Sequence, residues 1–249
     1  MPLRNLEALV LCGGLGMRLR SVVPELPKCL AAVGDRPFLE YVLLQLRAAG
    51  IRNVILCTGY RNEHVAEYFE TGERWGMSLN YSIEREALGT GGALKRAKRF
   101  VHGGTFLALN GDSILDIDLP KMVEFHKGQN ALATVALARV ESGDRYGTVE
   151  TDHTGQVTGF SEKASQEKSS VTTMEASTQI NGGVYVLDRR IFDEIPAAPP
   201  PVSLETEVFP RLAGRRVYGF STDGYFVDIG IPQDYAKAQR ELPRRFASC

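Results

Sequence analysis

Residues 7–16 read EALVLCGGLG, and MRLRSVVPELPK follows them up to Lys28. A short apolar run that ends in glycines is typical of a buried strand followed by a turn. Glycine has no Cβ, so the backbone at the three glycines can turn sharply and its N–H groups can approach an anion closely. The stretch therefore predicts a strand and an anion-binding loop, with Arg18 and Lys28 as cations beside a proline-bearing segment.

Short apolar runs alternate with amphipathic segments through the first half of the chain. The expected strands cover residues 7–12, 53–59, 78–84, 105–112 and 131–140. The connections between the strands carry apolar residues at helical spacing, and such repeats imply right-handed crossovers. We therefore predict an α/β fold with a Rossmann-like, mostly parallel sheet flanked by helices, in which ligands bind at the carboxyl ends of the strands.

From residue 139 onward the chain changes to short strand-like pieces joined by turns. We expect these pieces to form a smaller mixed-strand layer that faces the substrate and packs on the same sheet. Residues 164–177 are polar and rich in Ser and Thr, which predicts a mobile loop or hairpin tip. Ser203 and Pro232 suit the first turns of two later helices. Because no repeat or linker is evident, we predict one domain over residues 1–249.

Composition and charge exclude several classes of partner. The chain has 29 Lys and Arg against 30 Asp and Glu, with no basic stripe, so we expect no nucleic acid and no membrane partner. The four cysteines show no CxxC pairing, and three lie in or beside apolar stretches, as reduced buried thiols do. The sequence has neither a signal-peptide pattern nor a run of about 18 apolar residues. These features predict a soluble cytoplasmic protein.

The first glycine loop fits neither of two common phosphate-binding motifs. The dinucleotide fingerprint G-x-G-x-x-G would need glycine at Leu19, and the P-loop ending GK[ST] is absent. What remains is a glycine turn with two cations that could clamp a polyphosphate. Taken alone, an ordinary strand-to-helix turn with solvated cations explains the loop equally well.

Three further features favour the phosphate-binding interpretation. EREALGTGGALKRAK, residues 84–98, places a second glycine cluster at the start of an expected helix. NGDS and GYFVDIG place Asp112 and Asp228 at the carboxyl ends of expected strands. Carboxylates beside a polyphosphate often hold Mg²⁺, which needs only one or two of them. Each aspartate alone is more often a turn residue, so the prediction of a Mg²⁺ site depends on their coincidence with both loops.

Motifs along nearly the whole chain resemble those of the sugar-1-phosphate nucleotidyltransferase family. In order they are GGLGMRLRSVVPELPK, LGTGGAL, NGD, YGTV, FSEK, INGGVYV and DIGIPQDY. Within the family they look most like the heptose 1-phosphate guanylyltransferases, with the mannose 1-phosphate guanylyltransferases next. The resemblance implies a nucleotide-binding half, about residues 1–138, and a sugar-phosphate-binding half, about residues 139–249. Met17 departs from the family, which usually has threonine there, so a hydroxyl contact to phosphate is missing.

The resemblance also implies roles for the matching positions. The residues implied to bind the nucleotide are Leu11, Gly13, Gly14, Gly16, Met17, Arg18, Gly89, Thr90 and Gly111. The implied catalytic residues are Arg18, Lys28 and Asp112, and the implied Mg²⁺ ligands are Asp112 and Asp228. The residues implied to bind the sugar phosphate are Gly147, Glu162, Lys163 and Asn181. Glu162 and Asn181 would contact sugar hydroxyls, and Lys163 would contact the phosphate.

The reaction implied by the resemblance is Mg²⁺-dependent transfer of a nucleoside monophosphate from a nucleoside triphosphate to a sugar 1-phosphate. GMP from GTP and D-glycero-D-manno-heptose 1-phosphate are the favoured pair, and the product would serve surface polysaccharide synthesis. Transfer to mannose or glucose 1-phosphate with another base is one alternative. A non-catalytic module that senses nucleotide sugars is another, although such a sensor has less need of Mg²⁺ ligands. An apolar patch in the late strands would suit a homodimer.

Overall fold

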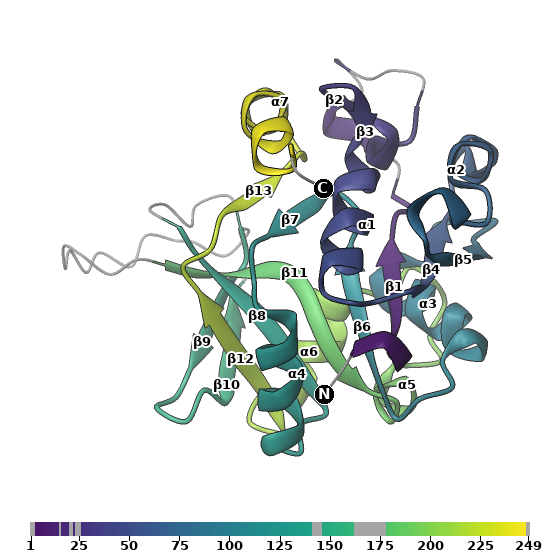
Figure 1. Cartoon of the computed structure of the whole chain (residues 1–249). Coiled ribbons are helices and arrows are strands. Elements are labelled where there is room, and N and C mark those ends of the chain that lie inside the picture. The colour runs from purple at the N-terminus through teal and green to yellow at the C-terminus, as the bar shows by residue number, and fades with distance from the viewer. Residues whose placement is uncertain are drawn as a thin grey trace.

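One nine-stranded mixed sheet runs through the computed structural model, which describes residues 3–14, 16–19, 22, 26–140, 146–161 and 178–247 (Figure 1). The first-half strands are β1 (Glu7–Leu11), β4 (Asn53–Thr58), β5 (Ser78–Ile83) and β6 (Thr105–Asn110). They lie in the order β6-β1-β4-β5, and every neighbouring pair is parallel. The four strands agree with the expected ranges, and the parallel order places their carboxyl ends at one edge of the sheet.

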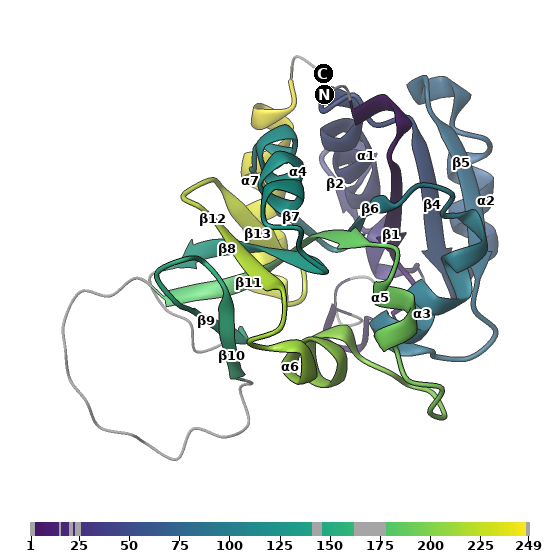
Figure 2. The same cartoon turned by 90° about the horizontal axis from the view of Figure 1, so that it is seen from below.

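Helices cover both faces of this sheet. The helices are α1 (Phe38–Ala48), α2 (Asn62–Phe69), α3 (Gly89–Ala97), α4 (Leu119–Gly128), α5 (Ile191–Glu194), α6 (Phe209–Leu212) and α7 (Pro232–Arg245). Figure 2 shows α1, α4 and α7 on one side of the sheet and α3, α5 and α6 on the other. Each side has its own cluster of buried apolar residues, because alternate strand residues point to opposite faces. The predicted α/β fold class is therefore confirmed.

Several short helical turns connect these elements. Those of the 3₁₀ type cover Leu3–Asn5, Met17–Leu19, Lys28–Leu30, Glu73–Trp75 and Lys98–Phe100. A π-helical turn over Leu204–Val208 leads into α6. As expected, Ser203 caps this turn: its Oγ accepts hydrogen bonds from the backbone N–H groups of Glu205, at 3.2 Å, and Thr206, at 3.1 Å. Pro232 occupies the first turn of α7, also as expected.

Most strands of the second half extend the main sheet instead of packing on it as a separate layer. They are β8 (Ala133–Val140), β9 (Thr148–Thr151), β10 (Val157–Ser161), β11 (Thr178–Asp188) and β12 (Val217–Thr222). The long strand β11 pairs antiparallel with β6, β8 and β9, so it continues the hydrogen-bonded ladder past the edge of β6. Such pairing satisfies the edge of β6, which a layer packed face to face would leave open.

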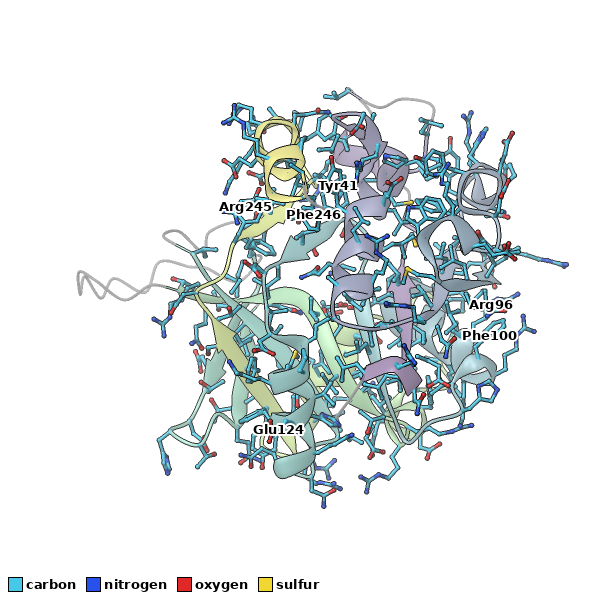
Figure 3. The ribbon with its side chains drawn as sticks, in the orientation of Figure 1. Tyr41, Arg96, Phe100, Glu124, Arg245 and Phe246 are labelled. Atoms are coloured by element: carbon cyan, nitrogen blue, oxygen red, sulfur yellow. The ribbon has the colours of Figure 1, made fainter. Side chains whose placement is uncertain are left out.

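Two small antiparallel sheets complete the fold. β7 (Ser113–Leu115) pairs with β13 (Phe226–Asp228), and β2 (Ala32–Val33) pairs with β3 (Arg36–Pro37). The end of α7 packs on α1, where the rings of Tyr41 and Phe246 meet edge to face with centroids 5.3 Å apart (Figure 3). The last helix thus contacts the first. Because β7 follows β6 in the chain, its pairing with β13 places β13 near the carboxyl end of β6.

Two sequence predictions concern loops and thiols. The expected mobile loop over residues 164–177 lies outside the described residues. Cys12, Cys29 and Cys57 are buried and form no disulfide, as the sequence predicted for three of its cysteines.

None of the helices in the described ranges combines the length and the apolar character that a membrane span needs.

His126 gives the fold a pH dependence that can be tested. This side chain of α4 is buried, and its Nδ1 lies 3.0 Å from Thr134 Oγ1 on β8. Burial lowers the pKa of His126 to about 4, although the Asp188 carboxylate opposes the shift. In the unfolded chain His126 is exposed and binds a proton below its ordinary pKa of about 6.5, whereas in the folded protein it binds one only at lower pH. The contribution of neutral His126 to the free energy of unfolding is therefore complete above pH 6.5. It is lost as the pH falls toward 4, and the loss is roughly 2–3 kcal/mol at pH 4.5.

Replacing His126 with asparagine removes this titration. We expect the free energy of unfolding of the variant, measured by urea titration, to fall less between pH 7.5 and pH 4.5 than that of the wild type. The difference between the two falls should be roughly 2–3 kcal/mol. Equal falls in both proteins would show that His126 is not the group responsible.

Candidate active site

Two adjoining cavities lie at the carboxyl ends of the parallel strands. The first, here called the lysine cavity, has a volume of about 210 Å³ and is lined by Arg18 and Lys28 among others. The second, here called the glycine-turn cavity, has a volume of about 300 Å³ and is lined by Gly89 and Thr90 among others. Leu11, Gly14 and Asp112 line both cavities, so the two form one continuous cleft.

The cleft gathers most of the residues singled out from the sequence. Those in the lysine cavity are Leu11, Gly14, Gly16, Arg18, Lys28, Gly111 and Asp112. Those in the glycine-turn cavity are Leu11, Gly13, Gly14, Gly89, Thr90 and Asp112. Asp228 joins them through its contact with Lys28. The backbone of Met17 belongs to the turn Met17–Leu19, and its side chain lies outside the described part of the chain.

The first glycine loop lies directly on the ends of two neighbouring strands. The N–H of Gly111 donates to the carbonyl of Leu11, at 2.9 Å, and the N–H of Cys12 donates to the carbonyl of Cys57, at 2.8 Å. A Cβ on Gly13 would lie 2.8 Å from the Oε1 atom of Glu84, so a larger residue there would push against that carboxylate. The absence of a side chain at Gly13 therefore leaves space for the Glu84 carboxylate where the loop passes over the sheet.

Lys28 lies between two aspartates. Its Nζ is 2.7 Å from Asp112 Oδ2 and 3.3 Å from Asp228 Oδ1. The small sheet of β7 and β13 brings the aspartates together, because Asp228 is paired with Ser113 and the N–H of Ile229 donates to the carbonyl of Asp112. Burial opposes the charge of Lys28, but the attraction of Asp112 and Asp228 outweighs it and raises the pKa of the lysine. The ammonium group is therefore charged at neutral pH.

The aspartate pair has the properties of a cation site. Burial, together with the negative charge of Asp112, raises the pKa of Asp228 despite its contact with Lys28. The pair carries one more negative charge than Lys28 neutralises, and carboxylate oxygens are the ligands that hard divalent cations prefer. No group of three or more His, Cys, Asp or Glu side chains suited to a metal occurs among the described residues. A cation held by the two aspartates would therefore complete its shell with water or phosphate oxygens.

The second glycine turn is fixed by a distant segment. The N–H of Val202 donates to the carbonyl of Leu88, at 2.8 Å, and the N–H of Gly91 donates back to the carbonyl of Val202, at 2.9 Å. Gly89 has φ +73°, and a Cβ there would lie 2.4 Å from the Val202 carbonyl oxygen. Both the left-handed conformation and the close approach therefore require glycine at this position.

The residues predicted to bind the sugar phosphate are only partly described. The N–H of Asn181, on β11, donates to the carbonyl of Gly147 at 3.3 Å, so these two residues lie together. Neither lines the two cavities. Glu162 and Lys163 lie outside the described residues.

The structure adds Glu84 to the cleft. This glutamate directly follows β5, is 8% exposed and lines the glycine-turn cavity. Its Oε2 accepts a hydrogen bond from the N–H of Leu88, at 3.3 Å, and burial raises the pKa of its carboxyl group. The position of Glu84 at a strand's carboxyl end is the signal that singled out Asp112, so the sequence contained the information to find it.

A larger cavity, of about 630 Å³, lies beside α2 and is lined by aromatic residues including Tyr68 and Trp75. Its lining shares no residue with the cleft. Charged groups that converge on one point, as Lys28, Asp112 and Asp228 do, are a better indication of chemistry than volume. We therefore take the cleft as the candidate active site.

Comparisons with known proteins identify the family to which the chain belongs. Residues 7–245 match the family described as nucleotidyl transferase. The chain is 44% identical over 239 residues to the D-glycero-alpha-D-manno-heptose 1-phosphate guanylyltransferase of Aneurinibacillus thermoaerophilus, covering 95% of this chain and 98% of that protein. The protein of the same name from Campylobacter jejuni subsp. jejuni serotype O:2 is 38% identical over 230 residues, covering 92% and 97%.

A solved structure supports the same assignment. HddC from Yersinia pseudotuberculosis, crystallised in complex with GMP-PN, superposes with a TM-score of 0.78 and 29% identity. The superposition covers 95% of this chain and 99% of that protein. These matches confirm the resemblance found in the sequence. The chain belongs to the nucleotidyl transferase family of enzymes.

Proposed function

We propose that this enzyme transfers GMP from GTP to a sugar 1-phosphate, with D-glycero-D-manno-heptose 1-phosphate as the favoured acceptor. The observation that carries the proposal is the placement of Lys28 between Asp112 and Asp228, where the two glycine-lined cavities meet. The names of the two relatives described above support the choice of base and sugar.

In the proposed reaction an oxygen of the sugar phosphate attacks the α-phosphorus of GTP. A new P–O bond forms, the bond from the α-phosphorus to the β-phosphate bridging oxygen breaks, and pyrophosphate leaves with the electron pair. The attacking phosphate is already ionised, so the reaction needs no general base, and positioning and electrostatics provide the catalysis. In this scheme Lys28 stabilises charge at the α-phosphate, and Arg18, which lines the same cavity, holds the outer phosphates.

We also propose that Asp112 and Asp228 hold Mg²⁺. The convergence of both carboxylates on one ammonium group supports this assignment, since their oxygens already face a common positive charge. Bound Mg²⁺ would offset the negative charge of the phosphates. Lys28 would then share the phosphate charge with the metal, which explains why a lysine and two carboxylates are needed at one point.

Glu84 supports guanine as the base. The Watson–Crick edge of guanine carries two adjacent N–H donors, on N1 and N2, and a carboxylate accepts two such bonds side by side. Adenine, cytosine, uracil and thymine do not present this pair of donors. Glu84 is the buried carboxylate of the glycine-turn cavity, and Gly13 beside it leaves room for a base to approach.

Replacing Glu84 with glutamine is expected to lower kcat/KM for GTP by about 10- to 100-fold. The amide would present one N–H group to the donors of guanine, and this repulsion is absent with the other bases. The measurement is pyrophosphate release with GTP, ATP, CTP, UTP and dTTP as competing donors. Glu86→Gln is the matched control, because this exposed residue undergoes the same chemical change two positions away. Unchanged preference for GTP in Glu84→Gln would assign base selection to other groups.

The remaining parts of the proposal concern the setting of the enzyme. Retention of Lys28, Asp112 and Asp228 together favours catalysis over a sensor that only binds nucleotide sugars. The continuous sheet, in which β11 pairs with both β6 and β8, supports a single domain. Three buried free thiols support a cytoplasmic location. A role in surface polysaccharide synthesis and a homodimer stay predictions.

A further inference from the structure

The carboxylate of Glu205 joins its own segment to two others, the start of α3 and the strand β11. Its Oε2 accepts hydrogen bonds from Thr90 Oγ1, at 2.6 Å, and from Ser203 Oγ, at 3.0 Å. Its Oε1 accepts a hydrogen bond from the hydroxyl of Tyr185, at 3.0 Å. A carboxylate is the side chain best suited to such a position, because both of its oxygens accept and neither donates.

On the nucleoside side, these contacts fix Thr90 at the start of α3. Its Oγ1 donates to Glu205 and accepts a hydrogen bond from the N–H of Leu204, at 2.8 Å. The N–H groups of Gly91 and Gly92 both donate to the carbonyl of Val202, at 2.9 and 3.3 Å. The whole second glycine turn is therefore attached to the segment that carries Glu205.

On the sugar side, the contacts fix Asn181. The hydroxyl of Tyr185 donates to Glu205 and accepts a hydrogen bond from Asn181 Nδ2, at 3.0 Å. Asn181 Oδ1 in turn accepts from the N–H of Gly183, at 3.0 Å, so both ends of the amide are held. Tyr185 is fully buried, and β11 has a register shift against β8 between Asn181 and Tyr185. Residues four positions apart in a strand point to the same side, so the asparagine and the tyrosine share one side of β11.

We propose that Glu205 is a positioning residue that holds Thr90 on the nucleoside side and Asn181 on the sugar side in one fixed arrangement. The inference rests on the proposed function for the naming of the two sides, but the bridge itself is independent of the substrates. Hydrogen bonds to a charged acceptor are stronger than neutral ones, and this part-buried network is built around the fully buried Tyr185, whose hydroxyl joins Glu205 to Asn181. Loss of the Tyr185 hydroxyl should therefore loosen the second glycine turn, and this loosening should require the carboxylate of Glu205.

Hydrogen exchange of the unliganded protein tests the bridge without using activity. The readout is exchange at the Gly91 and Gly92 amides, measured by mass spectrometry on peptides that span them. Tyr185→Phe removes one hydroxyl from β11, and we expect it to speed this exchange by about threefold to tenfold. In the Glu205→Gln background the same substitution should add less than twofold. An unchanged rate in Tyr185→Phe, or an equal acceleration in both backgrounds, would overturn the proposal.

Glu207→Gln is the matched control for Glu205→Gln. Glu207 lies on the same helical segment, and its Oε1 accepts a hydrogen bond from the N–H of Ser203 at 2.9 Å, within that segment. We expect Tyr185→Phe to keep its full effect on Gly91 and Gly92 in the Glu207→Gln background. Loss of the effect there would show that the helical segment as a whole, and not the Glu205 carboxylate, transmits the change, and would overturn the proposal.

Steady-state kinetics test the consequence for the two substrates. If the bridge works as proposed, Tyr185→Phe on the sugar side raises KM for the nucleotide, and Thr90→Val on the nucleoside side raises KM for the sugar phosphate, each by about threefold to tenfold. Combined with Glu205→Gln, each substitution should add little further. Effects confined to the nearer substrate would contradict the proposal. A wild type with no turnover would count against the proposed function, while the exchange measurement still decides the bridge.

Discussion

Replacing Lys28 with methionine is expected to lower kcat by about 10²- to 10³-fold while the fold is retained. Methionine keeps an unbranched chain that ends where Lys has Cε, and it removes the ammonium group that lies 2.7 Å from Asp112 and 3.3 Å from Asp228. The loss is large because the charge is held in place before the reaction and is partly shielded from water, the lysine side chain being 12% exposed. Binding of the nucleoside part should change much less, since the glycine-turn cavity is not altered.

The measurement for Lys28→Met is the rate of pyrophosphate release, with circular dichroism to check the fold. Lys121→Met is the matched control, because Lys121 is 74% exposed on the surface and pairs with Asp118 of the same helix start. We expect the control to keep near-normal activity. If Lys28→Met stayed within about tenfold of the wild type, the ammonium group would not be at the reacting phosphate.

Replacing Asp112 with asparagine is expected to lower kcat by about 10³-fold and to weaken metal binding. The change removes one of the two carboxylates that face Lys28, and a single remaining carboxylate leaves the proposed Mg²⁺ with fewer charged ligands. Asp228→Asn should have a similar effect, since one carboxylate oxygen of each aspartate contacts the ammonium group of Lys28. The fold should survive, because the amide can still accept a hydrogen bond from Lys28.

Metal binding gives a readout for these variants that is separate from turnover. We expect Mn²⁺, followed by electron paramagnetic resonance in the presence of GTP, to bind the wild type and to bind Asp112→Asn at least tenfold more weakly. Asp116→Asn is the matched control, an exposed aspartate four positions along the chain. Equal Mn²⁺ affinity in the wild type and Asp112→Asn would remove Asp112 from the proposed metal site.

The strand-end rule explains which parts of the site could be predicted from the sequence. Gly13 and Asp112 lie just after β1 and β6, and the second glycine turn lies in the connection after β5, so local pattern and the known geometry of such sheets place them at one edge. Glu84 obeys the same rule, because it directly follows β5, but the glycine motif after it is the more conspicuous pattern in the sequence. These placements need only knowledge of where each strand ends.

Glu205 and its partners could not be predicted in this way. Glu205 contacts Thr90 and Tyr185, which lie on other elements, and Tyr185 belongs to β11, a strand with a register shift against β8. Register is set by cross-strand pairing and not by a local pattern. For the same reason the later strands were expected to form a separate layer, although β11 pairs directly with β6 and extends the sheet.

The most direct test of the central claim is the fate of the α-phosphate of GTP. The purified protein would be incubated with Mg²⁺, heptose 1-phosphate and GTP labelled with ³²P at the α position. The account predicts that the label appears in GDP-heptose, that unlabelled pyrophosphate forms in equal amount, and that both need the sugar phosphate and are abolished by a chelator. Label in free GMP without a sugar nucleotide, or no product with heptose, mannose or glucose 1-phosphate, would contradict it.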